Sequence, residues 1–445
     1  MQHWLAMGLA DLGRGIEAGD IDPVALTQTY LDAIDTHDVR DKVYSVVTAE
    51  RAMAEAEAAA HRARIGQRLS LVDGVPISWK DLFDTADIVT EAGSKLLAGR
   101  TPKKDALVIQ NASASGLVCL GKTHMSELAF SGLGYNPSTA TPPCVNDASA
   151  VPGGSSSGAG ASVAFGLAAG AIGSDTGGSV RIPSAWNDLV GLKTTSGRIS
   201  LEGVVPLCLE FDTVGPLTRT VEDAAILMAA MEGRKSTDLR GATLKGRRFG
   251  LLQSVVLDDL RDAPAAAYEN AVDRLRQAGA VFEKVDVPEL EGPDGAMALS
   301  GPLFPGEAYG LWREIIEAHP EAMYEEILER FRIGLNFSAP DYVAAWARIR
   351  AARTAYDQKT AGFDAILAPT APILPPNLER LLTDAEYYKT ENLLALRNTR
   401  VGNLMGLCAL TLPTGVPSCG IMLMGKPNCE EALLRIGAAA QEALS

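Results

Sequence analysis

The sequence predicts an α/β protein in which helices cover a buried β-sheet. Helix and strand signals alternate along its 445 residues, the pattern of chains that build such a layered core. Hydrophobic residues make up 47% of the chain and charged residues 21%, so the chain can bury a large core and is not disordered. No internal repeat or low-complexity segment divides it. We therefore expect one domain over residues 1–445, with an inserted, mainly helical portion.

The first third of the chain predicts four helices and two strands. The clearest helix signal is that of Asp22 and Pro23, because aspartate caps a helix start and proline suits the first helical position. An apolar strand ends at Lys80, and the Gly/Pro/Asn-rich residues 131–152 predict a loop. The expected helices are 4–13, 23–36, 52–66 and 107–114, and the expected strands are 75–81 and 116–123.

The rest of the chain continues the alternation. Residues 234–247 are polar and basic and predict a surface linker. Helices are expected over 222–231, 265–278, 429–444 and, broken by Pro302, Pro305, Pro320 and Pro340, most of 296–360. Strands are expected over 249–252, 281–287 and 363–369, with two more inside 401–425.

Two clusters of glycine and serine, at residues 153–158 and 177–179, lie near the middle of the chain. Glycine leaves backbone N–H groups approachable, so each cluster can present a serine hydroxyl beside bare amide donors. Such donors suit an oxyanion that develops during acyl transfer. Ser155 and Ser179 are 24 residues apart, which allows a loop, a buried helix of about four turns and a return. We expect the two clusters to converge on one site.

Two short motif matches are rejected. Residues 116–123 fit the phosphate-binding pattern GxxxxGK[ST], but the intervening Leu-Val-Cys-Leu is the predicted strand itself and not an exposed loop. Residues 154–158 fit the GxSxG nucleophile elbow, centred on Ser156, but they follow a proline-rich loop and not a core strand. That elbow also needs a downstream histidine, and His319 alone lies downstream.

The base that activates a serine is expected to be a lysine, because histidines are scarce. Of five histidines, only His124 follows a strand near this region. A buried lysine can act as a base when desolvation lowers its pKa and populates the neutral amine. Lys80 fits this role, since it ends an apolar strand beside Trp79. A lysine at a strand end is by itself most often a surface residue, and the two glycine-serine clusters favour the catalytic interpretation.

The composition excludes several classes of protein. A net charge of −15 and a pI near 4.9 disfavour direct binding to nucleic acid or anionic membranes. No apolar run is long enough for a membrane span, and no secretion signal is recognisable, so a cytoplasmic protein is expected. The six cysteines lack CxxC spacing and are expected as free thiols. No His/Asp/Glu cluster has metal-ligand spacing, and we expect neither a metal nor a cofactor.

Residues 153–183, from the first glycine-serine cluster to Arg181-Ile182-Pro183, closely resemble the signature of the amidase signature family. The likeness covers nearly the whole chain, most securely residues 70–232. It implies a large mixed β-sheet covered by helices on both faces, in a single amidase domain with its catalytic core at 66–232 and with 234–390 lining the substrate side. Further family-like blocks are 74–76 with Lys80-Asp81, 121–127, 191–193, 212–216 and 368–372.

The resemblance implies a Ser-cisSer-Lys triad. Ser179 would attack the amide carbonyl to give an acyl-enzyme, while Ser155 would carry the proton between Ser179 and Lys80. An exposed ion pair contributes little, so the implied pair of Asp175 and Arg181 is expected to be buried. The other implied roles are an oxyanion hole from the N–H groups of Thr176, Gly177, Gly178 and Ser179, a supporting hydrogen bond from Ser156, and substrate contacts from Met125 and Gly154.

The resemblance implies an amidohydrolase that cleaves a linear carboxamide to a carboxylate and ammonia or an amine. An alternative is the A subunit of a glutamine-dependent aminoacyl-tRNA amidotransferase, which shares the triad and needs partner subunits to handle tRNA. A catalytically dead binding protein is a third, and the intact Lys80, Ser155 and Ser179 argue against it. Still open are whether the small-molecule amide is aliphatic, aryl or carboxylate-bearing, whether esters are cleaved, and whether the chain forms a homodimer.

Overall fold

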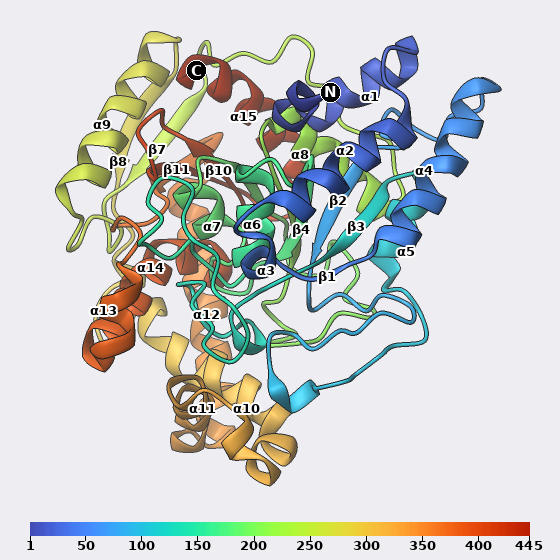
Figure 1. Cartoon of the computed structure of the whole chain (residues 1–445). Helices are drawn as coiled ribbons and strands as arrows, with labels where there is room; N and C mark the ends of the chain where they lie inside the picture. Colours follow the sequence, from blue (N-terminus) through green and yellow to red (C-terminus); the bar gives the residue numbers. More distant parts are fainter.

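Eleven β-strands form one mixed sheet through the middle of the protein (Figure 1), and the computed structural model describes residues 1–445. The strands are β1 (Tyr44–Val47), β2 (Pro76–Lys80), β3 (Val118–Thr123), β4 (Gly170–Ser174), β5 (Val190–Lys193), β6 (Val214–Thr218), β7 (Arg248–Leu252), β8 (Val281–Val285), β9 (Ala365–Pro369), β10 (Cys408–Pro413) and β11 (Gly420–Gly425). Their order across the sheet is β1-β3-β2-β4-β6-β5-β10-β11-β9-β7-β8. The predicted α/β class and the large mixed sheet are confirmed.

Parallel and antiparallel pairs both occur in this sheet. β2 lies between β3 and β4 and runs parallel to both, with Lys80 opposite Thr123 of β3. β4 pairs antiparallel with β6, so that Ser174 lies opposite Val214. Every residue of β2 and β4 is buried, because the strands on both sides and the helices on both faces exclude water. The side chain that ends β2 is therefore delivered into the interior.

Fifteen α-helices and seven short 3₁₀ helices connect the strands. The α-helices are α1 (Leu9–Ala18), α2 (Pro23–Thr36), α3 (Arg40–Val43), α4 (Ala49–Arg64), α5 (Leu107–Ala114), α6 (Ser157–Ala164), α7 (Arg181–Trp186), α8 (Val221–Glu232), α9 (Asp262–Gln277), α10 (Ser300–Ala318), α11 (Glu325–Arg332), α12 (Ala339–Thr360), α13 (Leu378–Thr383), α14 (Ala385–Leu404) and α15 (Glu430–Leu444). The 3₁₀ helices are η1 (Gln2–Ala6), η2 (Lys95–Leu97), η3 (Glu127–Ala129), η4 (Pro288–Leu290), η5 (Ala296–Leu299), η6 (Pro320–Ala322) and η7 (Ile333–Asn336). None of the helices combines the length and the apolar composition that a membrane crossing requires.

Helices pack on both faces of the sheet. Consecutive residues of β10 point to opposite faces, and two of them meet different helices. A Cβ added at Gly437 of α15 would touch Leu410, whereas one added at Gly402 of α14 would touch Ala409. One cluster of 99 buried hydrophobic residues reaches from Trp4 to Leu444, so both ends of the sheet share a core.

Helices α10, α11 and α12 form a helical lobe, which lies at the bottom of Figure 1. The lobe is held to the loop after β3, because Phe331 of α11 packs edge to face on Phe130 with ring centroids 4.8 Å apart. Residues 234–390 contain this lobe, but they also contribute β7, β8 and β9 to the central sheet. The lobe therefore sits over the loops that follow β3 and is continuous with the core.

Several predicted elements are confirmed and others are wrong. α2 and α5 occupy the predicted residues, and the Asp22 carboxylate accepts the N–H of Ala25 as a helix cap. The helix expected over residues 4–13 is wrong, because a 3₁₀ turn ends before Gly8 and α1 continues to Ala18. Pro302 and Pro305 lie within the first turns of α10 and do not break it, so only part of the proline punctuation is correct.

The chain between the two glycine-serine clusters also differs from expectation. Its helix, α6, has eight residues, about two turns instead of four. The remaining residues form β4, a central strand of the sheet. The chain therefore connects the first glycine-serine cluster to the second through a short helix and a strand. β1, β5, β6 and α14 are likewise not anticipated by the sequence analysis.

Candidate active site

Lys80, at the end of β2, is a fully buried titratable group near the two serine clusters. Its side chain is fully buried, and Nζ lies 2.6 Å from Oγ of Ser155 and 2.8 Å from Oγ of Ser174. Burial lowers the pKa of Lys80 to about 7, although the charges of Asp212 and Asp175 act in the opposite direction. A large fraction of this amine is therefore neutral at neutral pH and able to accept a proton.

The source of this desolvation is not the one expected from the sequence. Trp79 precedes Lys80 in β2, and consecutive strand residues point to opposite faces of a sheet. The indole packs instead against Phe83, with ring centroids 5.5 Å apart. The amine is desolvated on its own face of the sheet, where the loop that carries Ser155 and the end of β4 at Ser174 cover it.

The two serine clusters meet beside Lys80, as the sequence predicts. Ser155 follows a cis peptide bond from Gly154 and is fully buried. The N–H of Ser156 donates to the carbonyl of Ser179 at 3.3 Å, which joins the two loops. The Ser156 hydroxyl donates to the carbonyl of Ser174 and accepts the N–H of the same residue, so it is fully used in holding the end of β4.

Ser179 differs from the neighbouring serines because its hydroxyl is free. No hydrogen bond engages its Oγ, and the residue borders a small cavity of about 20 Å³. The N–H groups of Thr176, Gly177 and Ser179 also have no partner within the protein. These three donors and the hydroxyl lie on one short turn, which is the arrangement that an acyl-transfer site requires.

Gly178 must be removed from the predicted oxyanion hole. Its N–H donates to Oδ1 of Asp175 at 2.8 Å and is not available to a ligand. Its φ of +140° favours glycine, and an added Cβ would lie 2.2 Å from Oγ1 of Thr399. Gly178 therefore shapes the turn, while its neighbours supply the free donors.

A pair of alanine substitutions tests whether Gly178 shapes the turn and Gly177 does not. Gly178→Ala should destabilise the fold by about 2 kcal/mol or more, because it combines an unfavourable φ with a steric clash. Gly177→Ala should be tolerated, since its Cβ would meet no atom closer than 3.6 Å. Urea unfolding monitored by fluorescence measures both. Equal midpoints for the two variants would contradict the proposed role of Gly178.

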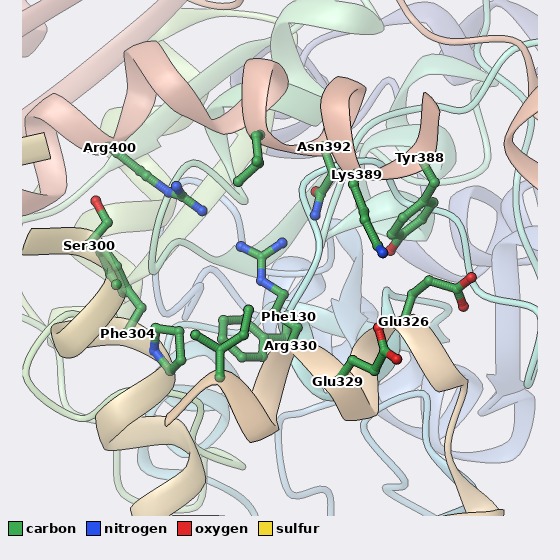
Figure 2. Close-up of a pocket in the computed structure, with 14 residues that line it drawn as sticks. Phe130, Ser300, Phe304, Glu326, Glu329, Arg330, Tyr388, Lys389, Asn392 and Arg400 are labelled. Carbon is green, nitrogen blue, oxygen red and sulfur yellow. The ribbon is translucent and has the colours of Figure 1, made fainter. Parts of the chain in front are cut away.

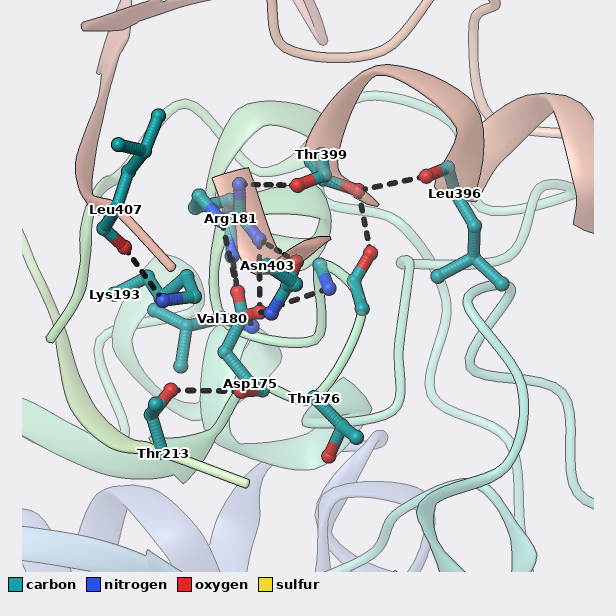
Figure 3. A network of polar contacts seen from close by, with 12 residues as sticks. Asp175, Thr176, Val180, Arg181, Lys193, Thr213, Leu396, Thr399, Asn403 and Leu407 are labelled. Atoms are coloured by element: carbon teal, nitrogen blue, oxygen red, sulfur yellow. Dashed lines mark hydrogen bonds and ion pairs between the residues drawn. The ribbon is translucent and has the colours of Figure 1, made fainter. Parts of the chain in front are cut away.

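The turn is anchored by a buried ion pair between Asp175 and Arg181 (Figure 3), as the sequence predicts. Two guanidinium nitrogens of Arg181 each lie 2.9 Å from the carboxylate, and neither side chain is exposed. Burial alone would raise the pKa of Asp175, but the charge and hydrogen bonds of Arg181 outweigh it and hold the pKa well below its ordinary value.

Helix α14 completes this anchor from the far end of the chain (Figure 3). Arg181 donates to the carbonyl of Thr399 at 2.8 Å, and Asn403 donates to Oδ1 of Asp175 at 3.0 Å. The Thr399 hydroxyl donates to the carbonyl of Gly177 at 2.7 Å. Every hydrogen-bonding group of the pair is thereby satisfied, which a buried ion pair needs in order to be stable.

A second carboxylate, Asp212, holds the other side of the turn. Its Oδ1 accepts the Thr176 hydroxyl at 2.5 Å, and its Oδ2 accepts the N–H groups of Leu207 and Cys208. Burial raises the pKa of Asp212. The next residue, Thr213, exchanges backbone hydrogen bonds with Asp175. The 212–216 block of the sequence therefore acts by fixing the main chain of the turn.

The two residues predicted to contact substrate lie elsewhere. Met125 is fully buried in the main hydrophobic core, and a Cβ at Gly154 would collide with Gly134 and with Oγ of Ser126. Neither residue borders the cavity at Ser179, and their contact with substrate stays a prediction. Its lining is Ala129, Phe130, Ser131, Thr176, Gly177, Ser179, Leu207, Phe304, Arg330, Leu396 and Arg400.

A larger cavity of about 320 Å³ adjoins the small one, and the two share Phe130, Phe304, Arg330 and Arg400 (Figure 2). The larger cavity lies between the helical lobe and α14. Sequence reasoning missed both arginines, because α14 is unassigned there and Arg330 falls in a helix with many exposed charges. Nowhere in the chain do three or more His, Cys, Asp or Glu side chains gather as metal ligands.

A mixed sheet that buries a lysine beside two glycine-serine turns places a candidate base near candidate nucleophiles. The family model described as Amidase matches residues 25–434, and the chain belongs to this family of enzymes that hydrolyse amide C–N bonds. The predicted family is thereby confirmed.

Three relatives illustrate the range of the family. The chain is 35% identical to 2-amino-5-chloromuconic acid deaminase of Comamonas testosteroni, over 97% of this chain and 94% of that protein. It is 33% identical to the A subunit of glutamyl-tRNA(Gln) amidotransferase from Anaeromyxobacter dehalogenans (strain 2CP-C), over 98% and 96%. The solved structure of native peptide amidase from Stenotrophomonas maltophilia is 28% identical and superposes with a TM-score of 0.81, over 98% and 97%.

Proposed function

We propose that this enzyme hydrolyses a carboxamide to a carboxylate and ammonia or an amine, with Ser179 as nucleophile, Ser155 as proton relay and Lys80 as base. The observation that carries this proposal is the 2.6 Å contact between Ser155 and a buried lysine whose pKa burial lowers to about 7. This contact lies next to the one serine hydroxyl of the site that is free and borders a cavity. A histidine base is not needed.

In the proposed reaction, Ser179 Oγ attacks the amide carbonyl carbon and passes its proton to Ser155, whose own proton goes to Nζ of Lys80. The negative charge on the carbonyl oxygen is accepted by the N–H groups of Thr176, Gly177 and Ser179. The same relay returns a proton to the departing nitrogen as the C–N bond breaks. Water then attacks the acyl-enzyme and gives its proton to the same relay, which returns a proton to Oγ of Ser179 as its bond to the acyl carbon breaks and the carboxylate leaves.

One link of this relay is absent from the free enzyme. Oγ of Ser179 makes no hydrogen bond to Oγ of Ser155, although the main chains of the two loops are bonded at Ser156. Catalytic hydrogen bonds are often long in free enzymes and tighten in the substrate complex. We propose that a bound amide closes this link.

A second candidate function follows from the relatives. The deaminase and the amidotransferase subunit match at 35% and 33% identity over nearly the same share of the chain, so identity alone does not choose between them. If the chain were an amidotransferase subunit, it would release ammonia from glutamine only after partner subunits are added. Release of ammonia from simple amides by the purified chain would favour the hydrolase.

An active-site probe tests the proposed nucleophile. A fluorophosphonate should label Ser179, as located by mass spectrometry of the tryptic digest, and Ser179→Ala should abolish both labelling and turnover. Ser157→Ala is the matched control, because that hydroxyl lies at the start of the neighbouring helix α6 and donates to the carbonyl of His124. Labelling of Ser156 instead would support the rejected nucleophile elbow and refute the proposal.

A further inference from the structure

Arg330 and Arg400 border the cavity at Ser179 without any acidic partner. No carboxylate lies within ion-pair distance of either guanidinium group, and neither group donates a hydrogen bond within the protein. The fully buried Lys122 and Lys193 are satisfied: Lys122 pairs with Asp81 at 3.1 Å, and Lys193 donates to two backbone carbonyls. Arg330 and Arg400 are partly buried, and two unpaired guanidinium groups that border one cavity indicate a site for an anion.

The apolar surroundings of the two guanidinium groups raise the cost of leaving them without an anion. Arg330 lies over the ring of Phe130, with its guanidinium carbon 4.6 Å from the centroid, and Arg400 lies 5.8 Å from that of Phe304. Figure 2 shows both guanidinium groups reaching toward the middle of the cavity. Burial lowers the pKa of Arg400 to about 9, with the like charge of Arg330 acting in the same direction. A bound anion would relieve both effects.

A third donor points into the same space. Oδ1 of Asn392 accepts the N–H of Gly132 and the hydroxyl of Ser131, which leaves its amide nitrogen free. In Figure 2 this nitrogen faces the arginines. Glu326 and Glu329 also border the cavity, but they lie on its side away from Arg400 and form no ion pair with either arginine. The centre of the cavity therefore presents donors only.

The arginines lie within reach of the reacting group. A Cβ added to Gly177 would be 3.7 Å from Cγ and 3.9 Å from Nε of Arg400, so this side chain packs on the turn that carries the free N–H groups. A ligand that fills both cavities would place one end at Ser179 and the other at the arginines. A guanidinium fork matches the planar geometry of a carboxylate and can bind both of its oxygens.

We infer that Arg330 and Arg400, together with Asn392, bind a carboxylate of the substrate, so that the enzyme acts on small amides that also carry a carboxylate group. This inference rests on the proposed function, because it takes Ser179 to mark the reacting end. The two arginines are then specificity-determining residues for the distal part of the substrate, and the adjoining cavity of about 320 Å³ limits that part to a small molecule.

Matched amides test the inference through ammonia release. Succinamate and glutaramate carry a distal carboxylate, butyramide and valeramide are their uncharged counterparts, and 3-phosphonopropionamide carries a different anion. We expect kcat/KM to favour the carboxylated amides at least 10-fold. Arg330→Met and Arg400→Met should each lower kcat/KM for these amides by about 10- to 100-fold, as for loss of a charged hydrogen bond, with less than about a threefold change for the uncharged ones.

Arg397→Met is the matched control, since Arg397 lies on α14 one turn before Arg400 but approaches Asp259 outside the cavity. The Arg397→Met variant should keep the wild-type preference for carboxylated amides over uncharged ones. Wild-type selectivity for uncharged amides, or equal losses on both classes in the arginine variants, would overturn the inference. Preference for the phosphonate would overturn the assignment to a carboxylate.

A binding measurement on the wild-type enzyme covers the case in which an arginine variant fails to fold. Succinate or glutarate should slow fluorophosphonate labelling of Ser179, whereas 1,4-butanediol at the same concentration should not. Absence of protection by either dicarboxylate would count against the inference, with the nucleophile still established by the labelling itself. Turnover of succinamate by Ser179→Ala would instead refute the proposed function and leave the anion site standing.

Discussion

Replacing Lys80 with methionine should lower kcat by about 10²- to 10⁴-fold, the usual contribution of a positioned acid–base group. Methionine is similar in volume and suits the buried position, but it cannot accept a proton. Steady-state kinetics measures the loss, and an unchanged thermal midpoint shows that the fold is intact. Ser174→Ala is the matched control, because it removes the other hydrogen-bond partner of Nζ and leaves the relay in place; it should cost much less.

The pH profile identifies the same group independently. A lysine with a pKa of about 7 is neutral above that pH, so kcat/KM should rise as the pH increases through 7 and then level off. His124 cannot account for this ionisation, because burial lowers its pKa to about 4. The rise should be missing from Lys80→Met. A profile that keeps the same midpoint in this variant would rule out Lys80 as the base.

The relay predicts that losses at Lys80 and Ser155 do not multiply. Groups that act as one unit lose their whole effect when any member is removed. The double variant Lys80→Met, Ser155→Ala should therefore be scarcely slower than either single variant. Multiplied effects would show that the two side chains act separately, in spite of the short contact between them.

The second prediction with a large expected effect concerns the contribution of the buried Asp175–Arg181 pair to the stability of the fold. Asp175→Asn should lower the free energy of unfolding by about 3–5 kcal/mol, the cost of leaving a buried cation unpaired, here Arg181. Chemical denaturation measures it. Asp238→Asn removes one half of an exposed pair with Arg240 and should leave the midpoint unchanged. Similar midpoints for both variants would contradict a structural role for the buried pair.

The pH dependence of stability follows from the direction of the shift. The folded-state pKa of Asp175 lies below its unfolded value near 3.9, so the pair stabilises the fold fully above that pH. The contribution is lost as the pH falls through the lower folded value. The difference in unfolding free energy between wild type and Asp175→Asn should therefore shrink in strongly acidic solution. A difference that stays constant would show that the charge of Asp175 is not its source.

The approach of Lys80 to the two glycine-serine clusters could be predicted from the sequence because each partner belongs to a short local motif. Lys80, Ser155, Asp175 and Ser179 belong to short motifs whose backbone geometry depends mainly on nearby glycines and strand ends. The errors at single residues arose where contacts between distant parts of the chain determine how a side chain is oriented. The orientation of Trp79 follows from the sheet, which the pattern of hydrophobic residues alone does not reveal.

Local composition explains why some of the strands and helices were missed. β4 is rich in glycine and alanine, and β6 contains Gly215 and Pro216, residues that are disfavoured in strands. α14 mixes polar and apolar residues without a clear stripe, because many of its buried residues are polar, among them Asn392, Asn398, Thr399 and Asn403. Without that helix, no sequence argument could bring Arg400 to the cavity.

Helix α14 also determines how readily the specificity of this enzyme can change. Asn392, Leu396 and Arg400 recur every four residues and form a row that faces the cavities. Thr399 and Asn403, also four apart, form the adjacent row that fastens the nucleophile turn. Substitutions in the first row can redirect the enzyme to new amides, whereas those in the second would disable it for every amide. Laboratory evolution should therefore vary the first row and keep the second unchanged.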